Sequence, residues 1–451
     1  MGKNIMFRFL VELNVRIMKN YLPSPFVFCI ILTALISAAV LTVTGQTLLQ
    51  AAGFWSDGLW SLLGFSMQMA LILVTGHVLA KAPSVGRLLD NLAAKIKTPR
   101  AAVAAVTLAA LIGCWLNWGF GLIIGAVFAK ALARQVRGVD YPLLVASAYS
   151  GFLIWHGGLS GSIPLALATE GADLVKLSGG TIQAAVPVAE TLFSPLNLTI
   201  VFGLLFGLPL LNMLMLPRNP LVADPEKLQE KAPEMPPRDT FAHKLDDSRL
   251  IALFLAAFGA VYLYAHFSRN GFSLALNVVI ALFLFAGLLA HGTPERYSRA
   301  VEDSAKGIAG IVLLFPFYGG IMGLVMGAPE GGTSLAAMIT NAFIAVSSER
   351  TFPVLAFLSA GLVNVFVPSG GGQWAVQGPV MLPAGAALGV DPAVSAMAVA
   401  WGDAWTNMIQ PFWALPLLGI VGLDARAIMG YCLTALLYSG ALIILAFLFL
   451  A

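Results

Sequence analysis

The chain has 451 residues, of which 59% are hydrophobic and 10% are charged, and its formal net charge is +3. Soluble domains carry about 25% charged residues, so this composition excludes an ordinary soluble protein. The small net charge gives no basis for a nucleic-acid partner. The three cysteines lie apart in apolar segments, without the spacing of a metal site or of a disulfide framework.

The N-terminal residues predict a surface helix followed by a first membrane span. Within residues 1–20, apolar residues recur at helical spacing among charged ones, and no small-residue cleavage site follows a short apolar core. An apolar run at 26–43 comes next. We therefore assign residues 1–50 to an N-terminal interfacial helix and a first span.

Apolar runs of spanning length recur along the whole chain. A helix needs about 20 residues to cross a bilayer. Such runs lie at residues 26–43, 59–80, 196–216, 250–266, 273–290, 308–326 and 428–450. They predict an all-α polytopic membrane protein, embedded in a lipid bilayer.

Two further apolar regions, 101–129 and 353–388, are interrupted by the glycine-rich stretches "NWGFG" and "PSGGG". We predict that each is a re-entrant hairpin, which enters and leaves the membrane on the same side. With a cytoplasmic N-terminus, every Lys and Arg except Lys176, Arg269 and Arg350 then lies in the cytoplasm. The same topology places the C-terminus outside a bacterial-type inner (cytoplasmic) membrane.

The two halves of the chain resemble each other. "GVD" at 138–140 recurs at 389–391, and the same offset places Gly119 on Gly370. Five predicted crossings separate the two hairpins, and because five is odd, the second copy is inverted. The predicted units are a first repeat at 51–216 with hairpin 101–129 and broken helix 142–165, a proline-rich cytoplasmic linker at 217–248, and a second repeat at 249–451 with hairpin 353–388 and broken helix 392–418.

Helix interruptions inside a membrane need a physical reason. An unpaired backbone amide in hydrocarbon costs several kcal/mol, so a break must face a polar cavity or a ligand. A half-helix starting near Gln373 would direct free N–H groups toward the middle of the membrane, and the tip at Asn117 would do so from the other side. The later spans break near "WHGG" and "WTNMIQP". Four such interruptions predict a site for a small anion.

The sequence resembles the ion transporter superfamily and, most specifically, its short-chain fatty acid transporter family of the acetoacetate and butyrate type. The resemblance covers essentially the whole chain. It rests on "NVFVPSGGGQWAVQGPVMLPAGAALGVDP" at 364–392 and "AWGDAWTNMIQPFWALPLLGI" at 400–420, with "CWLNWGFGLIIGAVFAKALA" at 114–133 in support.

This resemblance implies a homodimer whose scaffold holds a moving transport domain, with both hairpins and both broken helices sliding as an elevator. Independently of the resemblance, the amphipathic pattern of 84–97 predicts an interfacial helix, either an arm that links scaffold and mobile domain or an inert surface helix, and the corresponding stretch 333–348 would lie on the outer face. Dicarboxylate–sodium members of the superfamily carry Ser-Asn-Thr triplets at hairpin tips and helix breaks. None is intact here, so sodium coupling through those positions does not carry over.

The candidate substrate-binding residues are the polar, aromatic and glycine residues at the four interruptions. Several have simpler alternatives, since caps and backbone partners are needed wherever a helix breaks. Trp118, Trp374 and Trp405 could wall a pocket for an acyl chain or could simply pack. The candidates are Asn117, Trp118, Gly119, His156, Gly157, Ser369, Gly370, Gly371, Gly372, Gln373, Thr406 and Asn407.

Two ionisable residues are candidates for coupling. Asp403 is an acid in the middle of an apolar span, where such residues usually serve function, as a proton carrier or a cation ligand. His156 lies at the other broken helix and titrates near neutral pH, which suits proton coupling, although a structural histidine is the simpler interpretation. We expect no cofactor beyond a coupling Na⁺ or H⁺.

Together these features predict a secondary active transporter for short-chain monocarboxylates such as butyrate or acetoacetate, coupled to a cation. The alternative within this class is a transporter for a C4-dicarboxylate or a hydroxy acid, which would call for a further cationic or hydroxyl-rich patch. None of the four interruptions contains Lys or Arg. A membrane enzyme is disfavoured because neither HExxH nor GxSxG occurs, and paired breaks suit alternation better than a fixed channel.

Overall fold

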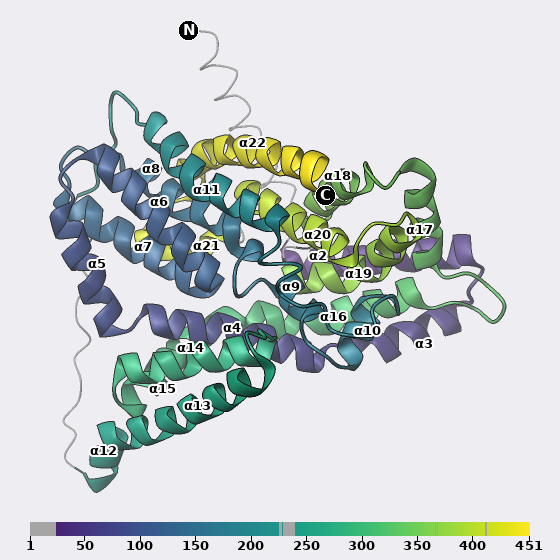
Figure 1. The fold of residues 1–451 in the computed structure, drawn as a ribbon, viewed down its shortest axis with the longest axis horizontal. Coiled ribbons are helices and arrows are strands. Elements are labelled where there is room, and N and C mark those ends of the chain that lie inside the picture. Colours follow the sequence, from purple (N-terminus) through teal and green to yellow (C-terminus); the bar gives the residue numbers. More distant parts are fainter. Residues whose placement is uncertain (1–23, 225–227, 229–239, 366, 368, 411–412) are drawn as a thin grey trace.

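The computed structural model shows a molecule built from helices, many of which run along its long axis (Figure 1). It describes residues 24–224, 228, 240–365, 367, 369–410 and 413–451. No strand occurs in these ranges, which confirms the all-α prediction. The surface helix expected within residues 1–20 lies outside them.

The N-terminal described helices are α2 (Pro25–Ala39), a π-helical turn at Val40–Thr44, α3 (Leu48–Leu59) and α4 (Leu63–Ala80). The apolar run expected at 59–80 is therefore α4 alone, which begins only at Leu63. Before it, α3 crosses α16 closely at Gly58, where the backbone of Gly319 occupies the place of a Cβ. Only glycine permits such an approach.

The first hairpin and the first broken helix follow α5 (Pro83–Lys95). The two arms of the hairpin pack against each other and are separated by Asn117 alone. The segment after it starts as an α-helix and then narrows to a 3₁₀-helix. The elements are α6 (Pro99–Leu116), α7 (Trp118–Gln135), α8 (Tyr141–Ser150), a 3₁₀-helix at Gly151–Gly157, α9 (Ser162–Leu167), α10 (Ala172–Leu177) and α11 (Pro195–Leu214).

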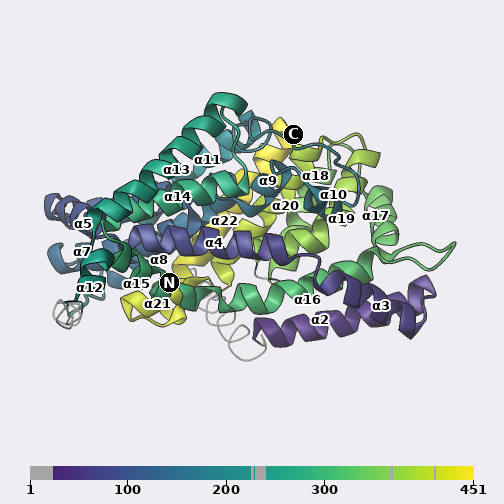
Figure 2. The ribbon, with the colours of Figure 1, turned by 90° about the horizontal axis from the view of Figure 1, so that it is seen from below.

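The central helices follow the linker. Of these, α13 and α14 pack side by side along one flank of the molecule, as Figures 1 and 2 show. The elements are α12 (Phe241–Asp246), α13 (Arg249–Asn270), α14 (Leu276–His291), α15 (Pro294–Ala305), a 3₁₀ turn at Lys306–Ile308 and α16 (Ala309–Met326).

The last part of the chain has the same order of elements as the first hairpin and broken helix. A helix matching the stretch expected at 333–348 precedes a hairpin, and a helix interrupted near its middle follows. The elements are α17 (Leu335–Val346), α18 (Phe352–Asn364), α19 (Gly370–Ala387), α20 (Pro392–Thr406), a 3₁₀ turn at Asn407–Ile409, α21 (Ala414–Val421) and α22 (Ala425–Leu450).

Packing contacts recur between the two halves. α6 packs against α7, α8 and the following 3₁₀-helix, and α18 packs against α19 and α20. A Cβ at Gly151 would clash with Ala110 of α6, and a Cβ at Gly402 would clash with Ala360 of α18. Small residues thus allow the same close crossing in both places. Figures 1 and 2 place α5 and α7 at one end of the molecule and α17 at the other.

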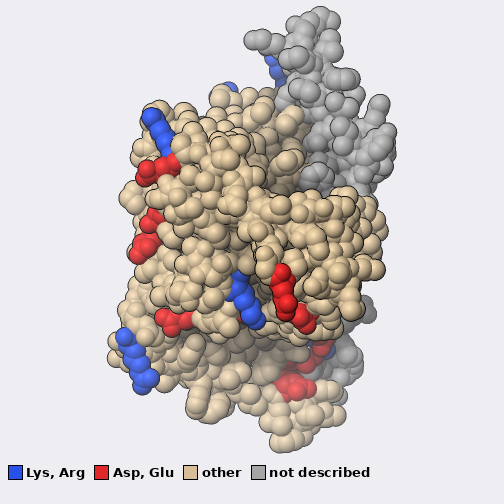
Figure 3. Space-filling view, turned by 90° about the vertical axis from the view of Figure 1, so that its right-hand side faces the viewer, with Lys and Arg blue, Asp and Glu red and all other residues tan. Residues whose placement is uncertain are grey.

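The surface of the described chain is suited to lipid. Large apolar side chains are exposed along α13, with Leu250, Phe254 and Phe258 each at least 65% exposed. Charged side chains are few and scattered on the end face shown in Figure 3. Helices long and apolar enough to span a bilayer cover Leu63–Ala80, Pro99–Leu116, Pro195–Leu214, Arg249–Asn270, Pro294–Met326 and Ala425–Leu450. The chain is a multi-pass membrane protein.

Candidate functional site

The first hairpin turns at Asn117, which is fully buried. Its Oδ1 accepts a hydrogen bond from the Phe120 amide at 3.0 Å and so caps α7. Its Nδ2 donates to the carbonyl of Ile72 in α4 at 3.2 Å, and the Trp118 amide donates to Ser160 Oγ at 2.9 Å. Asn117 therefore satisfies backbone groups, as the simpler interpretation expected, and its contact with substrate stays a prediction.

Around the first break lies an aromatic cluster, formed by Trp118, Phe152, Trp155 and Trp413. The rings of Trp118 and Trp413 have centroids 5.2 Å apart, and Phe152 and Trp155 stack at 5.5 Å. His156 follows directly and stacks on Trp155 with centroids 3.6 Å apart. The 3₁₀-helix thus places the rings of Phe152, Trp155 and His156 in one buried region.

The second hairpin tip is built from glycine. Ser369 is the N-cap of α19, because its Oγ accepts a hydrogen bond from the Gly372 amide at 3.3 Å. The half-helix begins at Gly370, so the expected start near Gln373 was wrong by almost one turn. Once capped and packed, the consecutive glycines adopt helical geometry, although each alone weakens a helix.

These glycines let the hairpin tip pack closely against neighbouring side chains. A Cβ at Gly370 would clash with the imidazole of His156 and the ring of Trp155. Gly371 lies against Phe65 and Phe315, and Gly372 against Tyr318. Pro368, part of the predicted tip, lies outside the described residues. The tip of the second hairpin is therefore pressed onto the first break and onto α4 and α16.

The second break is held by side-chain amides. Asn364 Nδ2 donates to the carbonyl of Asp403 at 2.8 Å and to Thr406 Oγ1 at 3.0 Å. Asn407 Nδ2 donates to the same Asp403 carbonyl at 2.6 Å, and Gln410 Nε2 donates to the Asn364 carbonyl at 3.2 Å. Thr406 and Asn407 therefore stabilise the interrupted backbone, whereas their contact with substrate stays a prediction.

The two broken helices meet at one ion-pair contact. His156 Nε2 lies 3.1 Å from Asp403 Oδ2, and both side chains are buried. Beside them, the Tyr149 hydroxyl donates to the carbonyl of Asn407 at 2.7 Å. The sequence named His156 and Asp403 separately as coupling candidates, and the fold brings them into direct contact.

Several buried polar atoms at this junction have no hydrogen-bond partner within the described chain. Such atoms are rare because each costs about 1–3 kcal/mol, and they point to a ligand, an ion or water. Those at the tip and the breaks include Trp155 Nε1, His156 Nδ1, Asn364 Oδ1, Gln373 Oε1, Asp403 Oδ1, Asn407 Oδ1 and Gln410 Oε1. His156 Nε2 makes the ion-pair contact with Asp403 Oδ2 without the geometry of a hydrogen bond.

Sequence reasoning missed Asn364 and Gln410. Asn364 hydrogen-bonds to Asp403 and Thr406, and Gln410 hydrogen-bonds to Asn364. The available signal was an amide residue in the apolar sequence near a helix break. Of the aromatic candidates, Trp118 joins the aromatic cluster, whereas Trp405 packs on Phe357 and donates its Nε1–H to the Leu436 carbonyl at 2.8 Å. Packing is thus the role observed for Trp405.

Metal binding finds no support in the described ranges, where no group of three His, Cys, Asp or Glu side chains is placed to hold an ion. The described polar atoms at the junction are mostly amide and carboxylate oxygens. Oxygen donors of this kind suit a proton or a hard monovalent cation rather than a transition metal.

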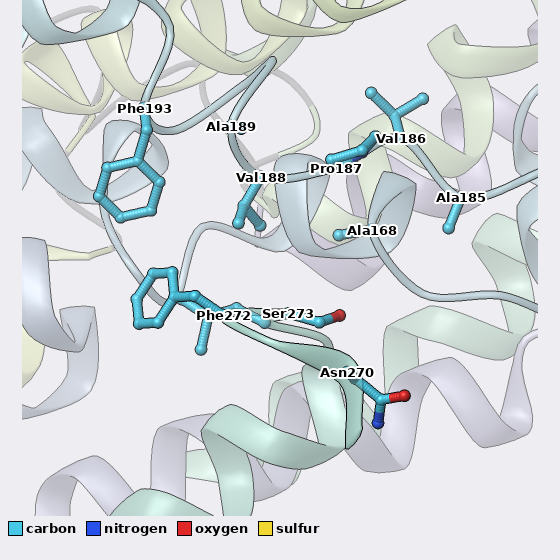
Figure 4. A pocket seen from close by; sticks show the side chains of 11 residues that line it. Ala168, Ala185, Val186, Pro187, Val188, Ala189, Phe193, Asn270, Phe272 and Ser273 are labelled. Atoms are coloured by element: carbon cyan, nitrogen blue, oxygen red, sulfur yellow. The ribbon is translucent and has the colours of Figure 1, made fainter. Parts of the chain in front are cut away.

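A cavity of about 720 Å³ lies apart from this junction (Figure 4). Its walls come from the loop before α11 and the turn between α13 and α14, including Phe193 and Phe272, whose ring centroids are 5.7 Å apart. None of the predicted site residues is among those that line it. Its size alone does not make it the substrate site, because it lacks converging polar side chains.

Comparison with known proteins places the chain among transporters. The family model described as short chain fatty acid transporter matches residues 6–450. A protein of Escherichia coli (strain K12), provisionally named a short-chain fatty acid transporter, is 45% identical, with 95% of this chain and 97% of that protein covered. A protein of Haemophilus influenzae (strain ATCC 51907 / DSM 11121 / KW20 / Rd), with the same provisional name, is 42% identical. The match covers 96% of this chain and 97% of that protein.

Two solved structures share the fold. The YdaH transporter of Alcanivorax borkumensis, described as having an unusual topology, aligns with a TM-score of 0.54 and 16% identity, covering 94% of this chain and 98% of that one. MtrF of Neisseria gonorrhoeae, described within a class of antimetabolite efflux pumps, aligns with a TM-score of 0.55 and 15% identity, covering 97% of each. The family match and the two relatives, covered over nearly their whole length, point to a transporter and not to an enzyme: the chain belongs to the short-chain fatty acid transporter family.

Proposed function

We propose that this protein is a secondary active transporter that moves short-chain monocarboxylates across the cytoplasmic membrane, driven by a coupled cation. The observation that carries this function is the buried contact of His156 with Asp403 where both broken helices meet the second hairpin tip. Buried ionisable groups at membrane depth mark substrate or ion pathways. The carboxylate would bind at this junction, to the amides of the tip and to side chains such as Ser369 and Gln373.

Charge balance is the reason to expect coupling. An anionic substrate beside an ionised Asp403 would be repelled, because like charges in a buried site disfavour each other. A proton or Na⁺ bound with the substrate would remove this repulsion. With one proton shared, the His156–Asp403 pair is neutral, and a second proton would give it a positive charge that attracts a carboxylate.

Alternating access would follow from two inverted repeats. Support comes from the matched crossings at Gly151 and Gly402 and from the placing of α6 and α7 toward one end of the molecule and α18 and α19 toward the other. In our proposal both hairpins and both broken helices form a transport domain, which slides as an elevator against a scaffold of α2, α4, α13, α14 and α16. The scaffold would pair two copies as a homodimer, with a cytoplasmic N-terminus and an external C-terminus.

The deciding experiment is uptake into proteoliposomes that contain the purified full chain. Labelled butyrate, acetoacetate and succinate are offered in turn, with a sodium gradient and a proton gradient imposed separately. We expect uptake of butyrate and acetoacetate, faster with one of the gradients than with neither. Protein-free liposomes measure leakage.

Each contrary result removes one part of the function. Preferential uptake of succinate would replace the monocarboxylate by a dicarboxylate. Equal uptake with and without both gradients would remove coupling. No uptake of any of the three acids by correctly folded protein would remove the transport function as proposed.

A further inference from the structure

A second cavity is lined by both arms of the second hairpin. We name this cavity of about 240 Å³ the hairpin pocket. It is lined by residues of α2, α16, α17, α18 and α19 and by Val367 between the last two, and nearly all of them are apolar, such as Leu32, Ile339 and Val363. In the proposed elevator, its walls belong partly to the moving hairpin and partly to the scaffold.

Two polar side chains interrupt this apolar lining. Gln377 is buried, and its Nε2 donates to Ser359 Oγ at 3.4 Å, a long hydrogen bond. The Oε1 of Gln377 accepts from Gln373 Nε2 at 2.7 Å, so its carbonyl is engaged and its NH₂ group is only weakly held. The hydroxyl of Ser359 and the NH₂ of Gln377 are thus two neutral donors at one wall.

This combination matches one chemical class. The two donors can bind the oxygens of a carboxylate, since hydrogen bonds to a charged acceptor are stronger than neutral ones. The apolar walls can bury a hydrocarbon chain. A cavity of about 150 Å³ holds benzene, with six carbons, so a pocket of 240 Å³ has room for a longer chain than that of butyrate.

We propose that the hairpin pocket binds a medium-chain monocarboxylic acid such as octanoate, with its carboxylate at Ser359 and Gln377. The binding site follows from the pocket alone, whereas its effect on transport rests on the proposed function. A ligand in contact with both α18–α19 and α2–α16 would hold the hairpin against the scaffold. Octanoate would therefore inhibit transport without competing for the central site. A longer-chain acid would act as an inhibitor, not as a better substrate.

The first arm measures inhibition of labelled butyrate uptake. We expect octanoate to lower the maximal rate and to leave the KM for butyrate unchanged. Competition, in which KM rises and the maximal rate is unchanged, would overturn the inference. From hexanoate to octanoate, each added methylene should lower the inhibition constant about four-fold, until the chain fills the pocket.

The second arm uses variants of α18. Val363→Phe fills the pocket, and Ser359→Ala removes one donor. Each should raise the inhibition constant of octanoate about ten-fold. Leu362→Phe is the matched control, because its side chain is 64% exposed and lies outside the pocket. Equal sensitivity of Val363→Phe and wild type would contradict the site.

The third arm separates this inference from the proposed function. Calorimetric titration of octanoate into the purified chain reports binding whether or not butyrate is transported. Octanoate binding that Val363→Phe weakens about ten-fold, without any butyrate uptake by the wild type, would keep the pocket and remove the transport function. Equal binding of 1-octanol would show recognition of the chain alone, as for a lipid tail, and would overturn the assignment of an acid.

Discussion

The two hairpin tips occupy corresponding places in the chain and are built differently. At the first, the Asn117 side chain uses both its oxygen and its nitrogen in hydrogen bonds to backbone. At the second, Ser369 caps the helix, but the buried Oε1 of Gln373 has no hydrogen-bond partner among the described residues, and Gly370 abuts His156. The first tip is a satisfied structural corner, whereas the second has polar capacity left for a ligand. Two hairpins with the same order of helices can therefore differ in whether their tip leaves polar atoms for a ligand.

The largest expected effect comes from the contact that joins the two breaks. Asp403→Asn keeps the shape of the side chain but removes its charge and its ability to carry a proton. We expect uptake driven by the coupling gradient to fall at least about 100-fold, a change of roughly 2.7 kcal/mol in the barrier. Uptake into proteoliposomes measures it, with exchange of labelled for unlabelled butyrate as a control for folding.

His156→Gln should reproduce this loss of gradient-driven uptake, because the same contact is broken from the other side. Full gradient-driven uptake in either variant would mean that the pair is structural and would remove it from coupling.

The next effect tests the close approach of the second tip. Gly370→Ala places a methyl group against His156 and Trp155 and should lower uptake by about ten-fold or more, with the protein still in the membrane. Gly53→Ala is the control, since a Cβ there meets nothing within 4 Å. Uptake equal to that of the control would show that the tip does not need to approach the first break.

Thermal unfolding should show that a substitution at the first tip lowers the free energy of unfolding more than one at the second tip. Asn117→Ala removes a cap and a buried hydrogen bond to α4, so we expect a loss of about 2–4 kcal/mol. Ser369→Ala removes a single cap and should cost about 1 kcal/mol. If Ser369→Ala were the more destabilising of the two, the second tip would be the structural corner instead.

The smallest effect concerns substrate affinity. Ser369→Ala and Gln373→Ala should each raise the apparent KM for butyrate by about ten-fold, the equivalent of one hydrogen bond to a charged group. Asn117→Ala, assayed at a temperature where it remains folded, should leave KM closer to that of the wild type. Unchanged KM in both second-tip variants would show that these residues only shape the turn.

Much of the architecture could be predicted from the sequence. Glycine and proline within apolar runs marked both hairpins and both breaks, because such residues disrupt helical hydrogen bonding wherever they fall. The acid at Asp403 and the histidine at His156 stood out as ionisable groups in apolar surroundings. Local composition was enough for these predictions.

Other features depended on contacts between distant segments. The start of α19 at Gly370 was missed because the cap by Ser369 and the packing of Phe65, Phe315 and Tyr318 override the low helix propensity of glycine. The roles of Asn364 and Gln410 were missed because their partners lie across the junction. The predicted repeat boundaries and the orientation of the ends remain predictions.

By itself, the sequence determined that this chain is an all-helical membrane protein, where its helices break, and which few polar residues enter its apolar interior, because hydrophobicity and backbone propensity are local properties. Only the tertiary structure decided that His156 meets Asp403, that the rings of Trp118, Phe152, Trp155 and Trp413 gather beside them, and that the tips differ. These outcomes depend on which surfaces pack together, and packing joins residues that the chain keeps far apart.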